Sequence, residues 1–212
     1  MHDFRYVKKS EYRPVEDKLE AILNAVNNNL EKRYRFTPTL VGSASYDMIT
    51  REANGNRGYD FDYFLNLSYS KWIEDNGKTV KDTIRRNLDA IVPRYGYDCG
   101  EDSKTVITIK VKDRANNRIV HGADLSIGFM DNQGNKYILK HNKNDGTYSY
   151  EISRNLKEMD EMYNFILRLG GEERLREEYL LLKNKDSNYS IPSHSILKQA
   201  MDNVINWFNQ TS

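Results

Sequence analysis

Apolar residues recur at intervals of three and four near the start of the chain, the spacing that places side chains on one face of a helix. The positions are Val15, Leu19, Ile22, Leu23, Val26 and Leu30. Pro14 precedes them, and proline suits the first position of a helix because the N–H that it lacks has no intrahelical partner there. The first element is therefore predicted to be a helix that begins near Pro14.

Between residues 59 and 67 the pattern changes to alternation. Aromatic and aliphatic residues occupy every second position, and the residues between them are Asp60, Asp62, Phe64 and Asn66. Alternate side chains of a strand share a face, and alpha carbons two residues apart lie about 6.6 Å from each other. We therefore expect Asp60 and Asp62 on one face of a strand, close enough to meet one ion.

Further elements follow the same two patterns. Thr79 is predicted to cap a second helix with a clear apolar stripe. The segments 106–111 and 118–129 are predicted to be two strands joined by a polar turn. Two shorter strand candidates, residues 136–140 and 147–152, either extend the sheet or form a flap.

Beyond about residue 153 the pattern is helical, and the clearest amphipathic stripe follows Pro192 and Ser193. The predicted fold class is α/β (α+β), with a mixed twisted sheet flanked by helices. We expect a core at residues 1–153 and a helical C-terminal segment at residues 154–212.

Composition narrows the function classes. The 212 residues include 32 Lys and Arg and 31 Asp and Glu, so the net charge of +1 draws the chain neither to nucleic acid nor to a membrane as a whole. No apolar run reaches about 18 residues, and the N-terminus has no apolar signal segment. The lone Cys99 cannot form an internal disulfide. These features predict a cytoplasmic protein without a membrane partner.

Candidate chemistry lies in three short segments. A predicted strand at residues 39–41 runs into Gly42-Ser43, the paired Asp60 and Asp62 follow, and Asp124 lies in the second strand of the later hairpin. Converging carboxylates repel one another unless a cation or a proton lies between them. Because all the ligands are oxygen atoms, Mg²⁺ is favoured, with Mn²⁺ as the alternative. Gly42 permits close approach of the backbone, and Ser43 can offer amide and hydroxyl groups to a phosphate.

These residues resemble the polymerase-beta-type nucleotidyltransferase superfamily, whose pattern is Gly-Ser, a spacer, Asp-x-Asp in an apolar strand and a third Asp on a later strand. The most similar branch contains CCA-adding enzymes, poly(A) polymerases, oligoadenylate synthetases and bacterial cyclic-oligonucleotide synthases. The resemblance covers roughly residues 39–129. The chain departs from the pattern in its longer spacer, Ala44 to Tyr59, and in Phe61, where an aliphatic residue is commoner.

The resemblance implies an enzyme that moves a nucleoside monophosphate from a nucleoside triphosphate to a hydroxyl acceptor and releases pyrophosphate. RNA, a nucleotide, a small molecule and a protein remain open as acceptors. It also implies two Mg²⁺ ions held by Asp60 and Asp62, with Asp124 assisting the ion that activates the acceptor hydroxyl. Gly42 and Ser43 would contact the β- or γ-phosphate. The alternative is a catalytically silent module that binds a nucleotide or nucleic acid, for example in a toxin–antitoxin or defence system.

Several neighbouring side chains have two interpretations. Asp47 is a fourth ligand or, preferably, a carboxylate at a helix start. His121 is most simply a neutral structural histidine. Tyr46 either stacks on a base or belongs to the core. In the helical segment, Arg168 and Lys198 are phosphate partners or ordinary surface residues.

Overall fold

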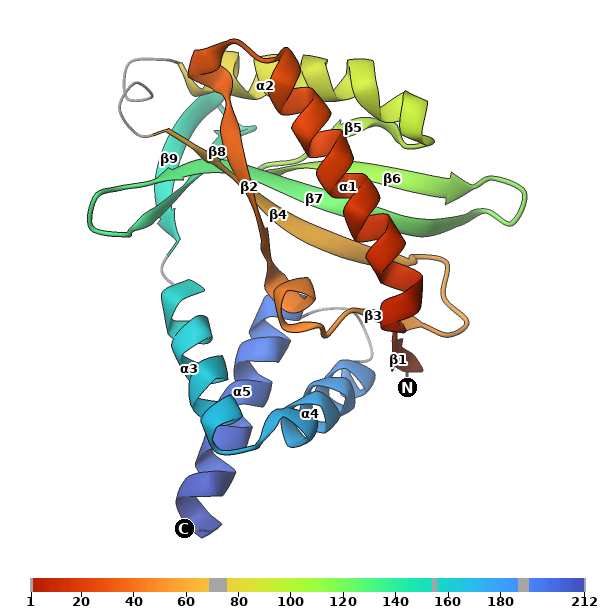
Figure 1. The fold of residues 1–212 in the computed structure, drawn as a ribbon, viewed down its shortest axis with the longest axis vertical. Helices are drawn as coiled ribbons and strands as arrows, with labels where there is room; N and C mark the ends of the chain where they lie inside the picture. Colours follow the sequence, from red (N-terminus) through yellow and green to blue (C-terminus); the bar gives the residue numbers. More distant parts are fainter. Residues whose placement is uncertain (1, 69–75, 154–155, 187–190, 212) are drawn as a thin grey trace.

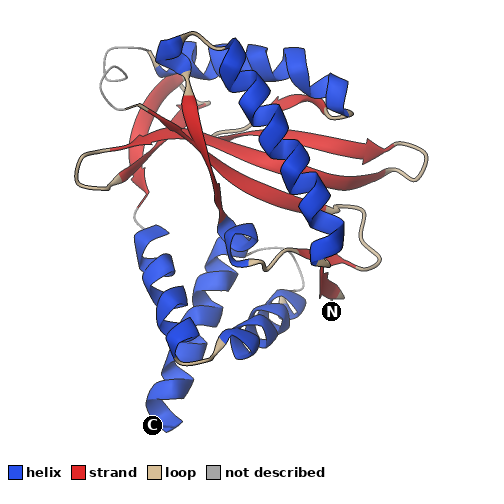
Figure 2. Cartoon of the chain, viewed as in Figure 1, coloured by secondary structure: helices blue, strands red, loops and turns tan. Residues whose placement is uncertain are grey.

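The computed structural model describes residues 2–68, 76–153, 156–186 and 191–211 (Figure 1). A seven-stranded mixed sheet forms its centre, with two long helices on one side and a group of three helices at one end (Figure 2). The fold class predicted from the sequence is therefore confirmed.

The large sheet has the strand order β2-β4-β7-β6-β5, and β8 pairs with both β7 and β9. Only β4 and β7 run parallel; the other pairs in this sheet are antiparallel. The strands are β2 (Phe36–Val41), β4 (Tyr59–Leu67), β5 (Asp98–Asp102), β6 (Val106–Asp113), β7 (Arg118–Met130), β8 (Lys136–Asn142) and β9 (Thr147–Ser153). The last two extend the sheet. A separate two-stranded sheet pairs β1 (Phe4–Tyr6) with β3 (Thr50–Glu52).

Helices α1 (Lys9–Asn29) and α2 (Gly77–Ile91) cover one face of the sheet and bury the apolar stripes that the sequence shows. Two predicted boundaries are wrong. α1 begins at Lys9, so Pro14 lies inside the helix, almost one and a half turns after its first residue. Proline has no backbone N–H, so the helix lacks one hydrogen bond at this position. The cap of α2 is Asn76, whose side chain accepts a hydrogen bond from the backbone N–H of Lys78, and not Thr79.

A second hydrophobic cluster lies among α3 (Leu156–Arg168), α4 (Glu172–Lys185) and α5 (Ser193–Thr211). Its buried members include Tyr179, Leu197 and Met201. Tyr46 and Met48, which follow Gly42-Ser43 in the chain, also pack into this cluster. The core and the helical segment are thus joined through the side chains of this turn.

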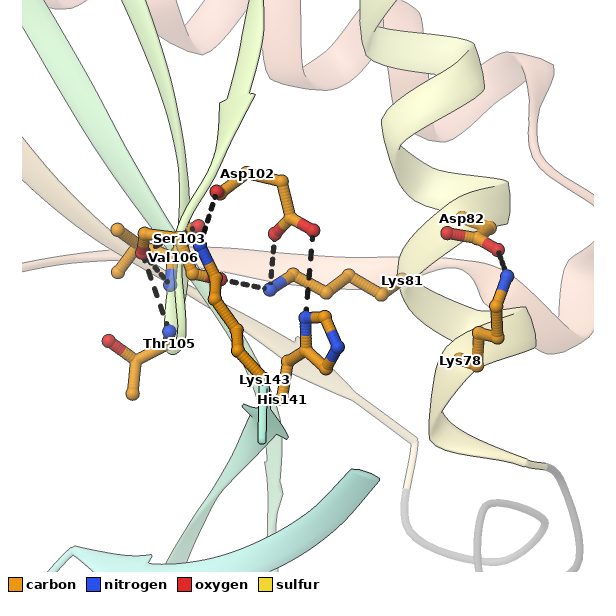
Figure 3. A network of polar contacts seen from close by, with 9 residues as sticks. All are labelled: Lys78, Lys81, Asp82, Asp102, Ser103, Thr105, Val106, His141 and Lys143. Atoms are coloured by element: carbon orange, nitrogen blue, oxygen red, sulfur yellow. Dashed lines mark hydrogen bonds and ion pairs between the residues drawn. The ribbon is translucent and has the colours of Figure 1, made fainter. Parts of the chain in front are cut away.

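A polar network ties the turn between β5 and β6 to α2 and β8 (Figure 3). The buried Lys81 pairs with Asp102, 2.6 Å from its Oδ1, and donates to the carbonyl of Ser103 at 2.7 Å. The backbone N–H of His141 donates to the carbonyl of Lys104. These contacts satisfy a buried cation and fix β8 against the rest of the sheet.

None of the helices in the described ranges is long and apolar enough to cross a membrane.

Candidate functional site

The parallel pair β4 and β7 brings two of the three predicted aspartates together. Asp62 stands opposite Asp124 in the register, and Asp60 stands opposite Gly122. Phe61 and Tyr63, which alternate with the aspartates, are buried in the core under α1 and α2. The carboxylates therefore share the face of the sheet that these helices leave open.

Each carboxylate of β4 lies against a glycine. A Cβ added to Gly42 would lie 2.4 Å from Oδ2 of Asp62, and one added to Gly122 would lie 2.6 Å from Oδ1 of Asp60. Gly42 also has a φ of +70°, a conformation that other residues rarely adopt. Its place at the end of β2, beside Asp62, accounts for the glycine of the Gly-Ser pair.

Burial and mutual repulsion raise the pKa of both carboxyl groups. The pKa of Asp62 rises to about 7, first through loss of solvent and then through the charges of Asp124 and Asp60. The pKa of Asp60 rises to about 6 through loss of solvent and the charge of Asp124, and solvent tempers this rise because Asp60 is exposed. In the absence of a cation, the pair therefore retains protons at a pH at which ordinary aspartates are ionised.

The three carboxylates offer only oxygen atoms on one face of the sheet, and oxygen is the ligand type that a hard divalent ion prefers. Asp124 accepts a hydrogen bond from the hydroxyl of Thr108, its register partner on β6. Among the residues that the structure describes, no three His, Cys, Asp or Glu side chains are gathered closely enough to hold a metal as they stand. Asp60, Asp62 and Asp124 share a face and interact electrostatically, but their carboxylates do not converge on one point at metal-binding distance.

The helical segment contributes a cation to the same place. Lys183 of α4 donates to the hydroxyl of Thr50 at 3.1 Å and to that of Ser193 at 3.3 Å. Burial lowers its pKa to about 8, while Asp60 and Asp62 act in the opposite direction. Lys183 therefore lies within the electrostatic reach of both aspartates.

A buried phenol accompanies this lysine. The hydroxyl of Tyr179 lies near Ser43, and its burial raises the pKa to about 12. That oxygen is buried, and the hydroxyls of Ser43, Thr50 and Ser193 lie around it without forming a hydrogen bond of good geometry. Together with Lys183, these hydroxyls form a polar group beside the Gly-Ser turn to which a ligand oxygen could bind.

Sequence reasoning missed Lys183, Tyr179 and Ser193 as a group. Lys183 and Tyr179 are four residues apart, so they lie on one face of α4. Tyr179 lies in the hydrophobic cluster of the helical segment. Only its hydroxyl reaches the site. The sequence feature that could have identified this group is the Tyr-x-x-x-Lys pair, which places a phenol and a lysine on the face of the helix that packs inward.

The other predicted residues lie as follows. Lys198 pairs with Glu158 at 3.2 Å and Asp202 at 3.3 Å, which is the surface role that the sequence left open. The guanidinium of Arg168 lies 5.9 Å from the ring centre of Phe165. His121 is buried, and burial lowers its pKa to about 4, so the neutral structural histidine is confirmed.

Asp47 does not start a helix. It follows the short 3-10 segment η2 (Gly42–Tyr46) and has a left-handed φ of 56°. Its carboxylate accepts hydrogen bonds from the hydroxyl of Tyr12 at 2.6 Å and from Lys9 at 3.1 Å, and its carbonyl accepts one from Arg176 at 2.8 Å. Asp47 thus ties the Gly-Ser turn to α1 and α4.

A cavity of about 230 Å³ adjoins Lys183 and Ser193. Phe4 and Arg57 line it as well, so β1 and the loop before β4 contribute to its wall. The ammonium of Lys183 lies 4.6 Å from the ring centre of Phe4. Asp186 also lines the cavity, so its polar wall combines two cations with one carboxylate.

Solved structures similar in fold to this chain include bacterial nucleotidyltransferases. The CD-NTase CdnG of Bradyrhizobium diazoefficiens, in complex with GTP, is 13% identical with a TM-score of 0.62, over 92% of this chain and 66% of that chain. The di-nucleotide cyclase DncV of Vibrio cholerae, also bound to GTP, is 11% identical with a TM-score of 0.68, over 94% and 69%. DncV in complex with the linear intermediate pppA(3',5')pG is 11% identical with a TM-score of 0.65, over 94% and 68%.

The chain thus spans about two thirds of the length of these proteins. At such low identity the likeness establishes the nucleotidyltransferase fold and no more. It falls on the cyclic-oligonucleotide synthases of the predicted branch rather than on CCA-adding enzymes or poly(A) polymerases. No protein-family model matches the sequence, and no protein of curated function is similar to it in sequence.

The carboxylate pair predicts an inverse dependence of stability on pH. Because Asp60 and Asp62 have a raised pKa in the folded state, the folded chain holds more protons than the unfolded chain between about pH 4 and about pH 7. The melting temperature of the metal-free protein should therefore be lowered by these two groups as the pH rises toward about 7. Asp62→Asn should raise the melting temperature at pH 8 by a few degrees and flatten the slope.

The matched control is Asp202→Asn on the surface of α5, which should leave the slope unchanged. Thermal melts from pH 5 to pH 8 in the presence of a chelator make the measurement. Equal slopes for Asp62→Asn and the wild type would contradict the raised pKa values.

The left-handed conformation of Asp47 predicts an order among its variants. Asp47→Gly keeps the backbone conformation and loses only the side-chain hydrogen bonds, whereas Asp47→Ala loses both. The alanine variant should be less stable than the glycine variant by about 1 kcal/mol. Urea unfolding of the two variants tests this order, and an alanine variant as stable as the glycine variant would refute it.

Proposed function

We propose that the chain is a metal-dependent nucleotidyltransferase that moves a nucleoside monophosphate from a triphosphate to a hydroxyl acceptor and releases pyrophosphate. The proposal rests on one observation: three aspartates and one lysine, from different parts of the chain, lie near one another on the same face of the sheet. Asp60, Asp62 and Asp124 share one face of β4 and β7, and Lys183 reaches the same face from α4. A triphosphate with bound metal ions is the kind of ligand that requires both.

Asp60, Asp62 and Asp124 would hold Mg²⁺, two ions in the full arrangement, with Mn²⁺ as a substitute. When bound, the ions would neutralise the triphosphate and lower the pKa of the acceptor hydroxyl. The protein's own groups then orient the substrate. The hydrogen bond from Thr108 keeps one oxygen of Asp124 in place and leaves the other oxygen for a ligand or for the proton of the acceptor.

The phosphates would lie at the Gly-Ser turn. Ser43 and Lys183 would contact the β- and γ-phosphates, and the unpartnered hydroxyl of Tyr179 would donate to the same anion. Ser193, at the start of α5, adds a hydroxyl and the positive end of a helix dipole. The anion would give Lys183 an ion-pair partner in addition to the hydroxyls of Thr50 and Ser193.

Structural neighbours support the donor class. Both DncV and CdnG are described in complex with GTP, and one DncV structure holds a linear dinucleotide intermediate. For this chain the acceptor stays open among RNA, a nucleotide, a small molecule and a protein. A silent binding module is the alternative, and the experiments below separate the two.

Asp62→Ala should lower nucleotide transfer by about 100-fold or more while leaving the protein folded, because it removes a metal ligand and relieves repulsion. Release of labelled pyrophosphate in the presence of Mg²⁺ and each of the four triphosphates measures transfer, and thermal melts check the fold. Asp202→Asn is the control. If wild type and Asp62→Ala transfer at equal rates, the carboxylates are not catalytic. If the wild type binds triphosphate but transfers nothing, the chain is a binding module.

Lys183→Met should weaken triphosphate binding roughly 10-fold, and Lys183→Arg should restore part of it, since the loss concerns a charge on the phosphates. Titrations with the triphosphate and the monophosphate of the same base distinguish this role from a structural one. The loss should be large for the triphosphate and small for the monophosphate. Equal losses for both ligands would show that Lys183 does not contact the β- and γ-phosphates.

A further inference from the structure

Two lysines of β6 lie on the face of the sheet that bears the aspartates. Lys110 stands opposite Gly122 in the register, and Gly122 stands opposite Asp60. A Cβ added to Gly122 would lie 2.6 Å from Oδ1 of Asp60 and 3.3 Å from Cγ of Lys110, so both side chains lie against this glycine. The ammonium groups of Lys110 and Lys112 contact the same carboxylate, Glu101, at 2.8 Å and 3.5 Å. Lys112 therefore shares this face.

A cavity of about 340 Å³ adjoins Lys112 where β6 turns into β7. The cations in its wall are Arg57, Lys112, Arg114 and Arg118. Arg57 belongs to the loop before β4 and also lines the cavity beside Lys183. A hydrogen bond of 2.7 Å from the backbone N–H of Ile119 to the carbonyl of Asn56 ties this loop to β7. The loop thus forms a wall that the two cavities share.

The wall of the cavity at the β6–β7 turn is predominantly basic. Asp113 is the single carboxylate among its described lining residues, against four cations. The larger cavity at the α3–α4 turn, of about 580 Å³, has the opposite balance, with three glutamates and one arginine. Since the whole chain carries a net charge of +1, these are local features of the surface. We define the basic strip as Lys110 together with the four cations of this wall.

The ion pairs of the basic strip leave it accessible to a ligand. Asp98 pairs with Lys112 at 3.1 Å and with Arg114 at 3.0 Å. Asp113 pairs with Arg118 at 3.0 Å. The side chains of these three cations are between 38% and 81% exposed. Ion pairs between such exposed groups are weak and are screened by salt. Phosphate groups can therefore join or displace these carboxylates.

The strand order places the basic strip on the acceptor side of the site. In the order β2-β4-β7-β6, the Gly-Ser turn follows β2, and the proposed phosphates of the donor lie there. Asp124 is on β7, and Lys110 and Lys112 are on β6, beyond it. An acceptor hydroxyl that meets the donor at Asp124 must leave room for the donor on the β2 side. The rest of the acceptor therefore extends over β6.

We propose that the acceptor is a single-stranded RNA whose backbone phosphates bind the basic strip and whose terminal hydroxyl lies at Asp124. The inference rests on the proposed function, because it places the second substrate of the same reaction. Arginine and lysine are the usual partners of nucleic-acid phosphates. From Lys110 to Arg114 the chain spans about 13 Å, a distance that a single phosphate does not cover. Among the acceptors left open, RNA alone repeats its phosphates along its length.

The proposed reaction lengthens the RNA by one nucleotide. The terminal hydroxyl oxygen forms a bond to the α-phosphorus of the triphosphate while the bond from that phosphorus to the pyrophosphate oxygen breaks. The hydroxyl proton passes to the oxygen of Asp124 to which Thr108 does not donate. Pyrophosphate leaves on the side of Lys183, and the backbone phosphates of the RNA stay on the basic strip.

The test titrates the full chain with AMP and with a dinucleotide, a tetranucleotide and a hexanucleotide of RNA, each with Mg²⁺. The affinity should rise at least about 10-fold from AMP to the tetranucleotide, because each added phosphate meets a further cation. Oligomers of adenosine and of uridine should bind equally, since phosphate contacts carry no base information. If about three phosphates are bound, the logarithm of the association constant should fall with the logarithm of the salt concentration with a slope of about −2.

The double variant Lys112→Met, Arg114→Met should weaken hexanucleotide binding by about 10-fold and make the salt slope shallower by about 1.4, because two phosphate contacts are lost. Its binding of triphosphate should equal that of the wild type. Lys183→Met should give the reverse pattern. The matched control is Lys32→Met, Lys157→Met, which removes two exposed lysines elsewhere on the surface and should leave RNA binding unchanged. Thermal melts verify that each variant is folded.

Transfer to the RNA is measured with a labelled triphosphate. The wild type should lengthen the hexanucleotide by one labelled nucleotide in each turnover. A hexanucleotide with a 2′,3′-dideoxy end should bind as tightly and gain no label. The variant Lys112→Met, Arg114→Met should require a higher RNA concentration for half-maximal rate and keep its maximal rate, because these residues position the RNA and do not touch the reacting atoms.

The outcomes separate this inference from the proposed function. If no triphosphate binds to the wild type, both are wrong. If triphosphate binds through Lys183 but AMP binds as tightly as the hexanucleotide, the RNA assignment alone is overturned. It is also overturned if Lys112→Met, Arg114→Met binds the hexanucleotide as the wild type does, or if the label appears on a mononucleotide or a protein and not on RNA.

Discussion

The parallel pairing of β4 with β7 places Asp62 beside Asp124, and the cost of holding like charges there governs the arrangement of the site. Water would screen the charges, but the neighbouring strands and the helical segment exclude much of it. Glycine at positions 42 and 122 gives the carboxylates room against the backbone, yet it does not lessen their repulsion. Bound protons or cations must therefore reduce the repulsion between the carboxylates.

The lysines that lie near these negative charges belong to elements other than β4 and β7, the strands that carry the aspartates. Lys183 belongs to α4, and Lys136 begins β8, where its ammonium lies over the ring of Phe64. Both are themselves poorly solvated, which lowers the pKa of each to about 8. Neither forms an ion pair with Asp60 or Asp62. Acids and bases are thus held near one another without cancelling, an arrangement suited to a ligand that carries both metal ions and phosphates.

The sequence predicted what depends on local pattern. Alternation in residues 59–67 and the hairpin at residues 106–129 located the strands that carry the acids, and the apolar stripes located the helices. Lys183 was not predicted, because its role depends on how α4 docks against the sheet, which no local spacing reveals. The start of α1 was misplaced because tertiary packing outweighs the preference of Pro14 for a first turn. Asp47 was misread because the chain turns back after one short 3-10 segment.

Tyr46 and Met48 are buried among α3, α4 and α5, while the strand that leads to them belongs to the sheet. The Gly-Ser turn therefore reaches its final position only when both hydrophobic clusters have formed. Partial unfolding of either half would therefore displace the turn. Binding of the proposed triphosphate at this turn would thus be lost in mild denaturant before the secondary structure is lost.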